Sequence, residues 1–268
     1  MTIIQPDPSL QPANFYKYRS MNSTESVERV ERIVLHDEVY FASAKSFNDP
    51  FDLNPAFSLQ ASPEQQRADF IRMSRKFNPS LTDPEHEAEA TRVMATSLSA
   101  TDVDTTTNVI QFAVRQHLIE SVGAFCVSER CNDLLMWAHY ADSHRGVCLE
   151  FDGAGGLMAS AQQVTYSLTR PAINHYEDER LTMLAKALLT KSAHWAYEAE
   201  WRLLRADNGP GVVRFRPENL TGIVVGALAT PETIEIVRRW AANRSTPLAL
   251  RRASVSNREF RLLVEPLR

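Results

Sequence analysis

The segment from Phe125 to Phe151, FCVSERCNDLLMWAHYADSHRGVCLEF, constrains the fold more than any other part of the chain. Two apolar runs typical of buried strands, GAFCVSE and RGVCLEF, enclose the helical pattern DLLMWAHYADSH. Segments bordered by such strands usually carry inert turn residues. This one carries histidines, aromatic rings, carboxylates and thiols, so we expect it to contribute to a functional site.

The chain before this segment predicts two strands with a helix between them. FYKYRS at 15–20 has the aromatic composition of a strand, and VYFAS at 39–43 predicts a second strand. Between them, Ser23 or Thr24 can cap a helix whose apolar residues recur with helical spacing. The tripeptide NDP at 48–50 then predicts a tight turn.

Residues from about 60 to 120 predict a helical insertion. SPEQQRADFIRMSRKF places Ser62 at a helix cap and Pro63 at the first helical position. The following NPSLTDPEHEAEA is polar and interrupted by proline, so we expect a surface loop or lid there. A helical stripe returns at 109–118.

The second half of the chain again mixes strands and helices. QQVTYS predicts a strand, and RLTMLAKALLTKSAHWAYEAEWRLLR predicts a long helix that gives way to a strand near Trp201. From Gly211 onward the pattern predicts strand, strand, helix, strand and strand. Because there is no internal repeat or low-complexity linker, we expect a single α+β domain over 1–268. It would have a mixed, mainly antiparallel sheet and a helical insertion at about 60–120.

Composition narrows the classes of function. A net charge of −4 provides no bulk attraction to nucleic acids or acidic membranes, although a local basic groove stays open. Three cysteines without regular spacing do not suggest a disulfide scaffold. The N-terminus lacks the regions of a secretion signal, and no apolar run approaches the roughly 20 residues of a membrane span. We therefore expect a soluble, cytoplasmic protein.

The histidines of the central segment, His139 and His144, raise the question of a metal site. They are five residues apart, whereas two ligands on one helical face are four apart. A third ligand would also require a neighbouring cysteine to fold back, so we predict no metal. Two interpretations stay open: a packed turn with Trp137 in the core, or a non-metal polar site that uses His139 or Tyr140.

The pair Glu198 and Glu200 is a second candidate for a functional site. If a strand begins at Glu198, both carboxylates face one side of it. Such like charges repel unless they have a partner, for example an arginine or a ribose hydroxyl. If the segment is still helical, the pair is a solvated face bonded to Lys191 or Arg205.

Polar residues at the ends of the first two predicted strands form a third candidate. Arg19, which ends the KYR of 17–19, could hold a phosphate or form a surface salt bridge of little energetic value. Ser43 and Ser46 could bond a ribose or simply cap the turn before Asn48.

Four motifs in this order resemble those of bacterial proteins of the domain of unknown function 2971. They are KYR at 17–19, FNDPF at 47–51, W-x-HYA…H-x-G-x-C-x-x-F at 137–151 and Y-E-x-E-W-R at 197–202. The resemblance extends from about residue 15 to 230. It implies relatives but no settled chemistry.

A looser similarity is to ADP-ribosyltransferases of the Arg–Ser–Glu type, which carry these residues on successive parts of a sheet. The matching positions are Arg19, Ser43 and the pair Glu198 and Glu200. The similarity implies that Arg19 holds the pyrophosphate of NAD and that Ser43 orients its ribose. Glu200 would bond the ribose 2′-hydroxyl and stabilise the transition state, and Glu198 would position or deprotonate the acceptor. SAKS here replaces the usual Ser-Thr-Ser, and the aromatic, histidine-rich segment has no counterpart.

Our leading hypothesis is an enzyme that binds NAD and transfers ADP-ribose to a nucleic-acid or protein acceptor, as a toxin or antiphage effector. Its catalytic residues would be Glu200, Glu198 and His139. The residues expected to contact the dinucleotide are Arg19, Ser43, Tyr18, Trp137, Tyr140 and His144.

Two other classes of function stay open. One is a phosphodiesterase or nuclease, with or without a metal, in which His139 or His144 is the general base near Asp49 and Arg145 contacts phosphate. The other is a non-catalytic domain that senses a small ligand. NAD consumption without nucleic-acid cleavage would distinguish the leading hypothesis from both.

Overall fold

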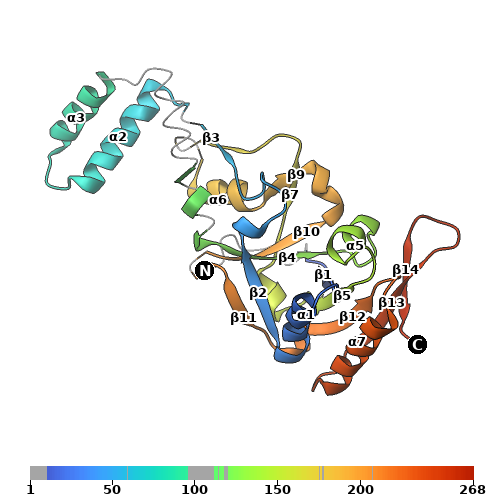
Figure 1. Ribbon diagram of the computed structural model, residues 1–268. Helices are drawn as coiled ribbons and strands as arrows, with labels where there is room; N and C mark the ends of the chain where they lie inside the picture. Colours follow the sequence, from blue (N-terminus) through green and yellow to red (C-terminus); the bar gives the residue numbers. More distant parts are fainter. Residues whose placement is uncertain are drawn as a thin grey trace.

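A ten-stranded sheet forms the centre of the structure (Figure 1). The computed structural model describes residues 11–58, 60–95, 112–113, 115–117, 120–174, 176, 178–206 and 208–268. The strands of this sheet are β1 (Asn14–Arg19), β2 (Glu38–Ser43), β4 (Gly123–Ser128), β5 (Val147–Asp152), β6 (Gln162–Gln163), β10 (Glu200–Arg205), β11 (Gly211–Arg214), β12 (Leu220–Val225), β13 (Ala249–Val255) and β14 (Leu262–Pro266).

The order of the strands is β11-β2-β4-β1-β5-β12-β13-β14, and β10 pairs with β4 and β6. In this sheet β12 and β13 run parallel, and the other described pairs are antiparallel. The predicted α+β class with a mixed, mainly antiparallel sheet is confirmed.

Smaller elements lie beside the main sheet. Two short parallel pairs join β3 (Ala56–Ser58) to β8 (Ala172–Asn174) and β7 (Thr165–Ser167) to β9 (Thr190–Ser192). The described α-helices are α1 (Thr24–His36), α2 (Pro63–Phe77), α3 (Asp83–Ala95), α5 (Leu134–Tyr140), α6 (Arg180–Leu188) and α7 (Pro231–Asn243). The described 3₁₀ helices are η2 (Ala44–Ser46), η3 (Gly156–Ser160), η4 (Ala193–Glu198) and η5 (Pro217–Asn219). None of the helices in the described ranges has the length and apolarity that crossing a bilayer requires.

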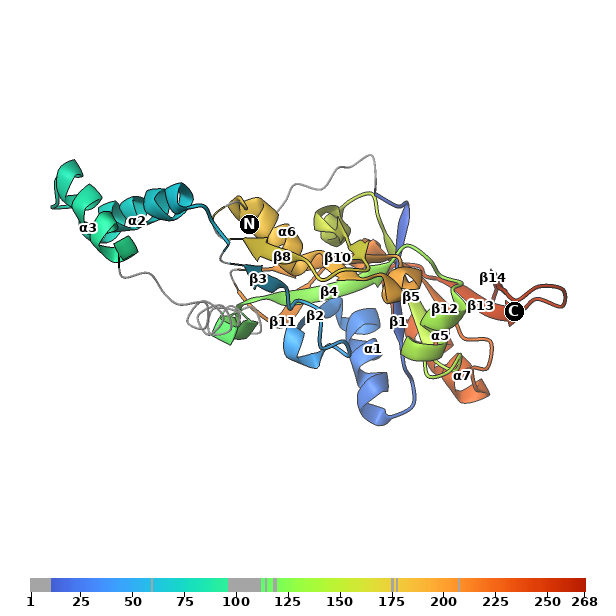
Figure 2. The same ribbon diagram turned by 90° about the horizontal axis from the view of Figure 1, so that it is seen from above.

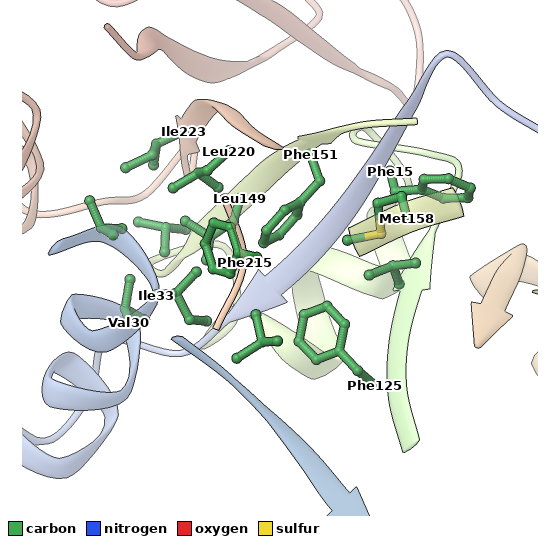
Figure 3. Close-up of a cluster of buried hydrophobic side chains, with 14 of the residues drawn as sticks. Phe15, Val30, Ile33, Phe125, Leu149, Phe151, Met158, Phe215, Leu220 and Ile223 are labelled. Carbon is green, nitrogen blue, oxygen red and sulfur yellow. The ribbon is translucent and has the colours of Figure 1, made fainter. Parts of the chain in front are cut away.

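Alternating side chains divide the core between the two faces of the sheet. On β5, Leu149 and Phe151 belong to the larger cluster, which α1 and α7 cover, and ten members of that cluster are labelled in Figure 3. Cys148 belongs to a second cluster on the opposite face, which packs under Trp137 of α5. Burial on both faces explains why four of the six residues of β5 are apolar.

Local capping confirms two predicted helix starts. The Ser23 hydroxyl accepts the N–H of Ser26, and the Ser26 hydroxyl accepts the N–H of Ser23, which is a reciprocal capping box. Ser62 and Gln65 repeat the arrangement at α2. Each box satisfies donors that the first helical turn leaves without partners.

Two predicted elements were wrong. The expected loop at NPSLTDPEHEAEA contains α3, which packs against α2 as a hairpin that extends from the rest of the structure (Figures 1 and 2). The Ser74 hydroxyl lies 2.8 Å from Nδ1 of the buried His86, a contact between the helices that local pattern does not reveal. The expected long helix ends at Leu188, because Lys191 enters β9 and the chain then forms η4.

The helical stripe expected at 109–118 lies mostly outside the described residues.

The two edges of β4 are paired very differently. β10 pairs with β4 along its whole length, from Gly123 to Ser128. On the other edge, β1 pairs with β4 only at Ser128, and β2 pairs with it only at Gly123 and Ala124. Between these points β4 has no strand partner on that edge in the described structure. There the Lys17 ammonium donates to the Cys126 carbonyl at 2.5 Å.

A close approach of backbones holds the end of β1 in place. Gly146 accepts the N–H of Gly226 at 2.9 Å, and a Cβ on Gly146 would lie 2.2 Å from the Arg19 carbonyl oxygen. Backbone atoms cannot rotate away from such a clash as a side chain can. Glycine is therefore required beside Arg19.

We predict that Gly146→Ala lowers the free energy of unfolding by about 1–3 kcal/mol, the usual cost of overpacking a close-packed site. Urea denaturation followed by circular dichroism measures the change. Gly155→Ala is the control, because no atom lies within 4 Å of a Cβ built there. Equal stability of the two variants would contradict the close approach.

Candidate functional site

A cavity of about 910 Å³ lies beside the unpaired stretch of β4. Because β1 and β2 diverge there, residues from both faces of the sheet line it. α1 contributes Arg29 and Ile33 on one face, and α5 contributes His139 and Tyr140 on the other. The volume is in the range of natural small-molecule sites. The charged residues of the lining are Lys17, Arg19, Arg29, Arg32, Glu38, Asp52, Lys191, Glu198 and Glu200.

One part of the cavity holds cations without counter-ions. Among the described residues, neither Lys17 nor Arg19 forms an ion pair, and Nε of Arg19 is buried without a hydrogen-bond partner. Burial and the charge of Arg19 lower the pKa of Lys17 to about 8. Burial and the charge of Arg29 lower the pKa of Arg19 to about 10. Both cations would be stabilised by a bound anion.

Another part of the cavity borders a buried cluster of charges centred on Arg202, which lies behind the lining residues Asp52, Lys191 and Glu200. Its guanidinium is inaccessible to solvent and donates to Glu200 Oε1, to Asp52 Oδ2 and to the Leu188 carbonyl, at 2.8, 2.8 and 2.9 Å. Lys191 donates to Glu200 Oε2 at 2.9 Å. Burial alone would raise the pKa of Glu200, but Arg202 and Lys191 outweigh it and lower that pKa well below its usual value.

Glu198 differs from Glu200 in both partners and acidity. It ends η4, and Ala199 then takes a left-handed conformation (φ 42°) before β10 begins. Its Oε1 accepts the Tyr140 hydroxyl at 2.6 Å, and its Oε2 accepts Lys191 at 2.5 Å. Burial raises the pKa of Glu198, and the charge of Glu200 raises it further. A carboxylate with a raised pKa that lines a cavity suits proton transfer.

The FNDPF loop after β2 connects directly to this cluster. Asn48 donates to the Tyr140 hydroxyl at 3.2 Å, and Asp49 Oδ2 accepts the indole N–H of Trp195 at 2.8 Å. The Phe47 ring lies 5.8 Å from the guanidinium of Arg202. Together with Asp52, these contacts explain why the motif combines aromatic and polar residues.

The predicted site residues divide into two groups. Those that line the cavity are Tyr18, Arg19, His139, Tyr140, Glu198 and Glu200. Ser43, Trp137 and His144 do not, so the contacts expected of them with a dinucleotide are not supported by their positions.

Each residue outside the lining has a local role. Ser43 caps the turn after β2 by accepting the N–H of Lys45, and Ser46 lines the cavity instead. Trp137 is fully buried and packs edge-on against Tyr18, as the packed-turn interpretation predicted. His144 lies in a left-handed turn (φ 68°) whose carbonyl accepts the N–H of Leu228.

Sequence reasoning missed four charged residues of the site: Lys17, Asp52, Lys191 and Arg202. Lys191 was considered only as a partner of Glu198 and Glu200 on a solvated helix. Their convergence on Lys191 is present, but on a buried strand and a 3₁₀ helix. The apolar neighbours of Arg202, Trp201 and Leu203, were a signal that this cation is buried, whereas Lys191 lies between Thr190 and Ser192 and gave no such signal.

The nuclease alternative lacks a common site for its residues. His139 lines the cavity and His144 does not. Both Asp49 oxygens accept internal hydrogen bonds, from Phe51 N–H and from Trp195. Across the described ranges, no group of three or more His, Cys, Asp or Glu side chains is placed to hold a metal ion.

The comparisons with known proteins bear on one part of the site. Residues 136–203 match the family model DUF2971, described as a protein of unknown function. The matched segment includes Tyr140, Lys191, Glu198, Glu200 and Arg202. It supports the family resemblance seen in the motifs, and it says nothing of ADP-ribosyl transfer. Searches of curated proteins and of solved structures found no match.

We predict that Glu200→Gln lowers the free energy of unfolding at pH 7 by about 3–5 kcal/mol, because it leaves buried cations without part of their counter-charge. A carboxylate whose pKa is lower in the folded state stabilises the protein at pH values above its unfolded pKa of about 4.3. This stabilisation is lost as the pH falls. The deficit of the variant should therefore shrink below about pH 4. Urea titrations at several pH values measure it, with the exposed Glu265→Gln as control. A deficit that grows on acidification would contradict this assignment.

Proposed function

We propose that the cavity binds NAD and that the protein transfers ADP-ribose from it to an acceptor. One observation carries the proposal: Arg19, His139, Glu198 and Glu200, which are far apart in sequence, line one cavity. Cations without counter-ions and buried carboxylates are thereby placed in the same site. This combination suits a ligand that has both a pyrophosphate and ribose hydroxyls.

The cations are suited to the pyrophosphate. Arg19 presents a planar fork of donors that can bond two phosphate oxygens at once, and Lys17 adds a point charge. The hydroxyl of Ser20, which accepts the N–H of Asn22, also lines the cavity and offers a further donor. Binding an anion would offset the desolvation that lowers the pKa of both Lys17 and Arg19.

The carboxylates take different roles in this proposal. Glu200 already accepts from Arg202 through both of its oxygens and from Lys191, so we assign it to positioning Lys191. Glu198 is the carboxylate that acts on substrate. The bond between ribose C1′ and nicotinamide breaks, nicotinamide leaves with the electron pair, and the acceptor bonds to C1′. Glu198 stabilises the positive charge on the ribose and takes the proton of the acceptor.

Tyr140 and Lys191 prepare Glu198 for this role. Each donates to one of its carboxylate oxygens, which fixes the plane of the group before substrate arrives. Such preorganisation is a main source of catalytic rate. His139, which also lines the cavity, is placed to contact substrate.

We predict that Glu198→Gln lowers kcat for nicotinamide release from NAD by about 100-fold or more, as expected when a general base is lost. Release is measured by chromatography on purified protein with a panel of nucleic acids and proteins as acceptors. Glu235→Gln, on the exposed face of α7, is the control.

Two outcomes would overturn the proposal. One is equal release by wild type and Glu198→Gln, and the other is no release by wild type with any acceptor. A rise in Tm with NAD but without turnover would instead favour the ligand-sensing alternative.

We predict that NAD binds more weakly as the pH rises above about 8, because Lys17 then loses its charge in the free protein. The Kd should increase by up to tenfold per pH unit above that point. Isothermal titration calorimetry from pH 7 to 9 measures it. Lys17→Met should remove the pH dependence, whereas Lys76→Met on the exposed face of α2 should keep it. An affinity that is constant over this range in the wild type would refute a role for Lys17.

A further inference from the structure

We infer that three aromatic side chains at the margin of the cavity, His139, Tyr197 and Trp195, form the acceptor site, and that the acceptor is a base of a single-stranded nucleic acid. We call these three residues the aromatic rim. The inference rests on the proposed function for the donor, and it names the class of the second substrate.

The rings of the rim follow one another at stacking distance. The centroids of His139 and Tyr197 are 6.1 Å apart with 37° between the planes, and those of Tyr197 and Trp195 are 6.0 Å apart with 44°. Both pairs are tilted rather than edge-on. His139 is exposed, and the other two are half-buried. Such a row provides an uninterrupted platform for planar groups.

The rim begins where the cavity ends. His139 lines the cavity, whereas Tyr197 and Trp195 do not, so the row extends beyond the lining. Tyr197 precedes Glu198 in the chain, and Tyr140, next to His139, donates to Glu198 Oε1. A donor in the cavity and a base on the rim would therefore meet at Glu198.

Contacts on the inner side hold the outer ring rigidly. The indole N–H of Trp195 donates to Asp49, and the ammonium of Lys191 lies 5.3 Å from the centroid of the Trp195 ring. Because Lys191 is buried, the ring face it covers is the inner one. The rim is thus organised before a partner binds, which reduces the entropy lost on binding.

The surroundings of the rim favour nucleic acid over protein as the acceptor. Phe51, two residues from the Asp49 that holds Trp195, exposes 62% of its surface, and the Arg170 guanidinium lies 5.9 Å from its ring. Lys45 on the same loop is also exposed. Aromatic rings interleaved with exposed cations are typical of surfaces that stack bases and contact phosphates. The net charge of −4 argues against broad binding to duplexes, so the contact would be short and based on stacking.

The transfer of ADP-ribose to a base is balanced in atoms and electrons. A nitrogen of the base that carries a hydrogen, either an exocyclic amine or a ring N–H, forms the new bond to ribose C1′ as nicotinamide leaves with its electron pair. The proton released from that nitrogen passes to Glu198. No redox partner is required.

The test compares binding and modification of one oligonucleotide by several variants. A fluorescent single-stranded DNA of mixed sequence, and the RNA of the same sequence, are titrated with wild type, Tyr197→Ala, Tyr197→Phe and Phe260→Ala. Phe260 is a fully exposed aromatic on the turn between β13 and β14 and serves as the matched control. Mass spectrometry of the oligonucleotide after incubation with NAD detects the transferred ADP-ribose.

We expect Tyr197→Ala to weaken oligonucleotide binding by about 5- to 150-fold, the range for loss of one base stack. Tyr197→Phe keeps the ring and should restore binding, and Phe260→Ala should match the wild type. Thermal melting of all four proteins separates a loss of stacking from a loss of fold.

The outcomes distinguish this inference from the proposed function. No oligonucleotide binding by the wild type, or equal binding by Tyr197→Ala and Phe260→Ala, overturns the rim. Modification of proteins but not of oligonucleotides also overturns it and leaves the NAD-dependent activity standing. Oligonucleotide binding that depends on Tyr197 without NAD consumption supports the rim and refutes the proposed transfer.

Discussion

The burial of Arg202 is the constraint on which the site depends. A guanidinium cannot lose its charge in a protein, so a fully buried one must be surrounded by acceptors. Those acceptors come from the end of α6, from β10 and from Asp52, which directly follows the FNDPF motif in the same loop. Because Asp52 must reach Arg202, the whole loop closes over the cluster. That closure brings Asn48 to Tyr140 and Asp49 to Trp195, and it thereby forms both a wall of the cavity and the support of the aromatic rim.

Local interactions made much of the fold predictable from sequence. The starts of α1 and α2 follow from Ser23 and Ser62, whose side chains bond backbone groups only three residues away. The strands β4 and β5 follow from apolar runs whose length excludes helices. The errors arose where contacts between residues far apart in sequence determine the secondary structure. α3 is stabilised against α2 through His86, and the predicted long helix breaks because Lys191 bonds carboxylates beyond its own turn.

The site was predictable as a set of residue types but not as a geometry. Arg19, His139 and Glu198 were identified because their chemistry is unusual next to apolar runs. Whether a side chain reaches the cavity depends on which strands pair and in which register, and the local sequence does not determine this. Ser43 ends β2 yet caps a turn, and Trp137 faces the core although it is two residues from His139. The two lysines were missed because lysine is nearly always a surface residue, and only the three-dimensional neighbours make burial tolerable.

The interrupted edge of β4 implies a conflict between stability and activity. Full pairing of β1 with β4 would add backbone hydrogen bonds and would make the Lys17 contact with Cys126 unnecessary. It would also close the space between β1 and β2 in which the cavity lies. Substitutions selected only for thermal stability would therefore tend to close this gap and abolish ligand binding. Conversely, variants with a wider gap should enlarge the cavity at the expense of the sheet, so the length of this pairing sets the size of the cavity.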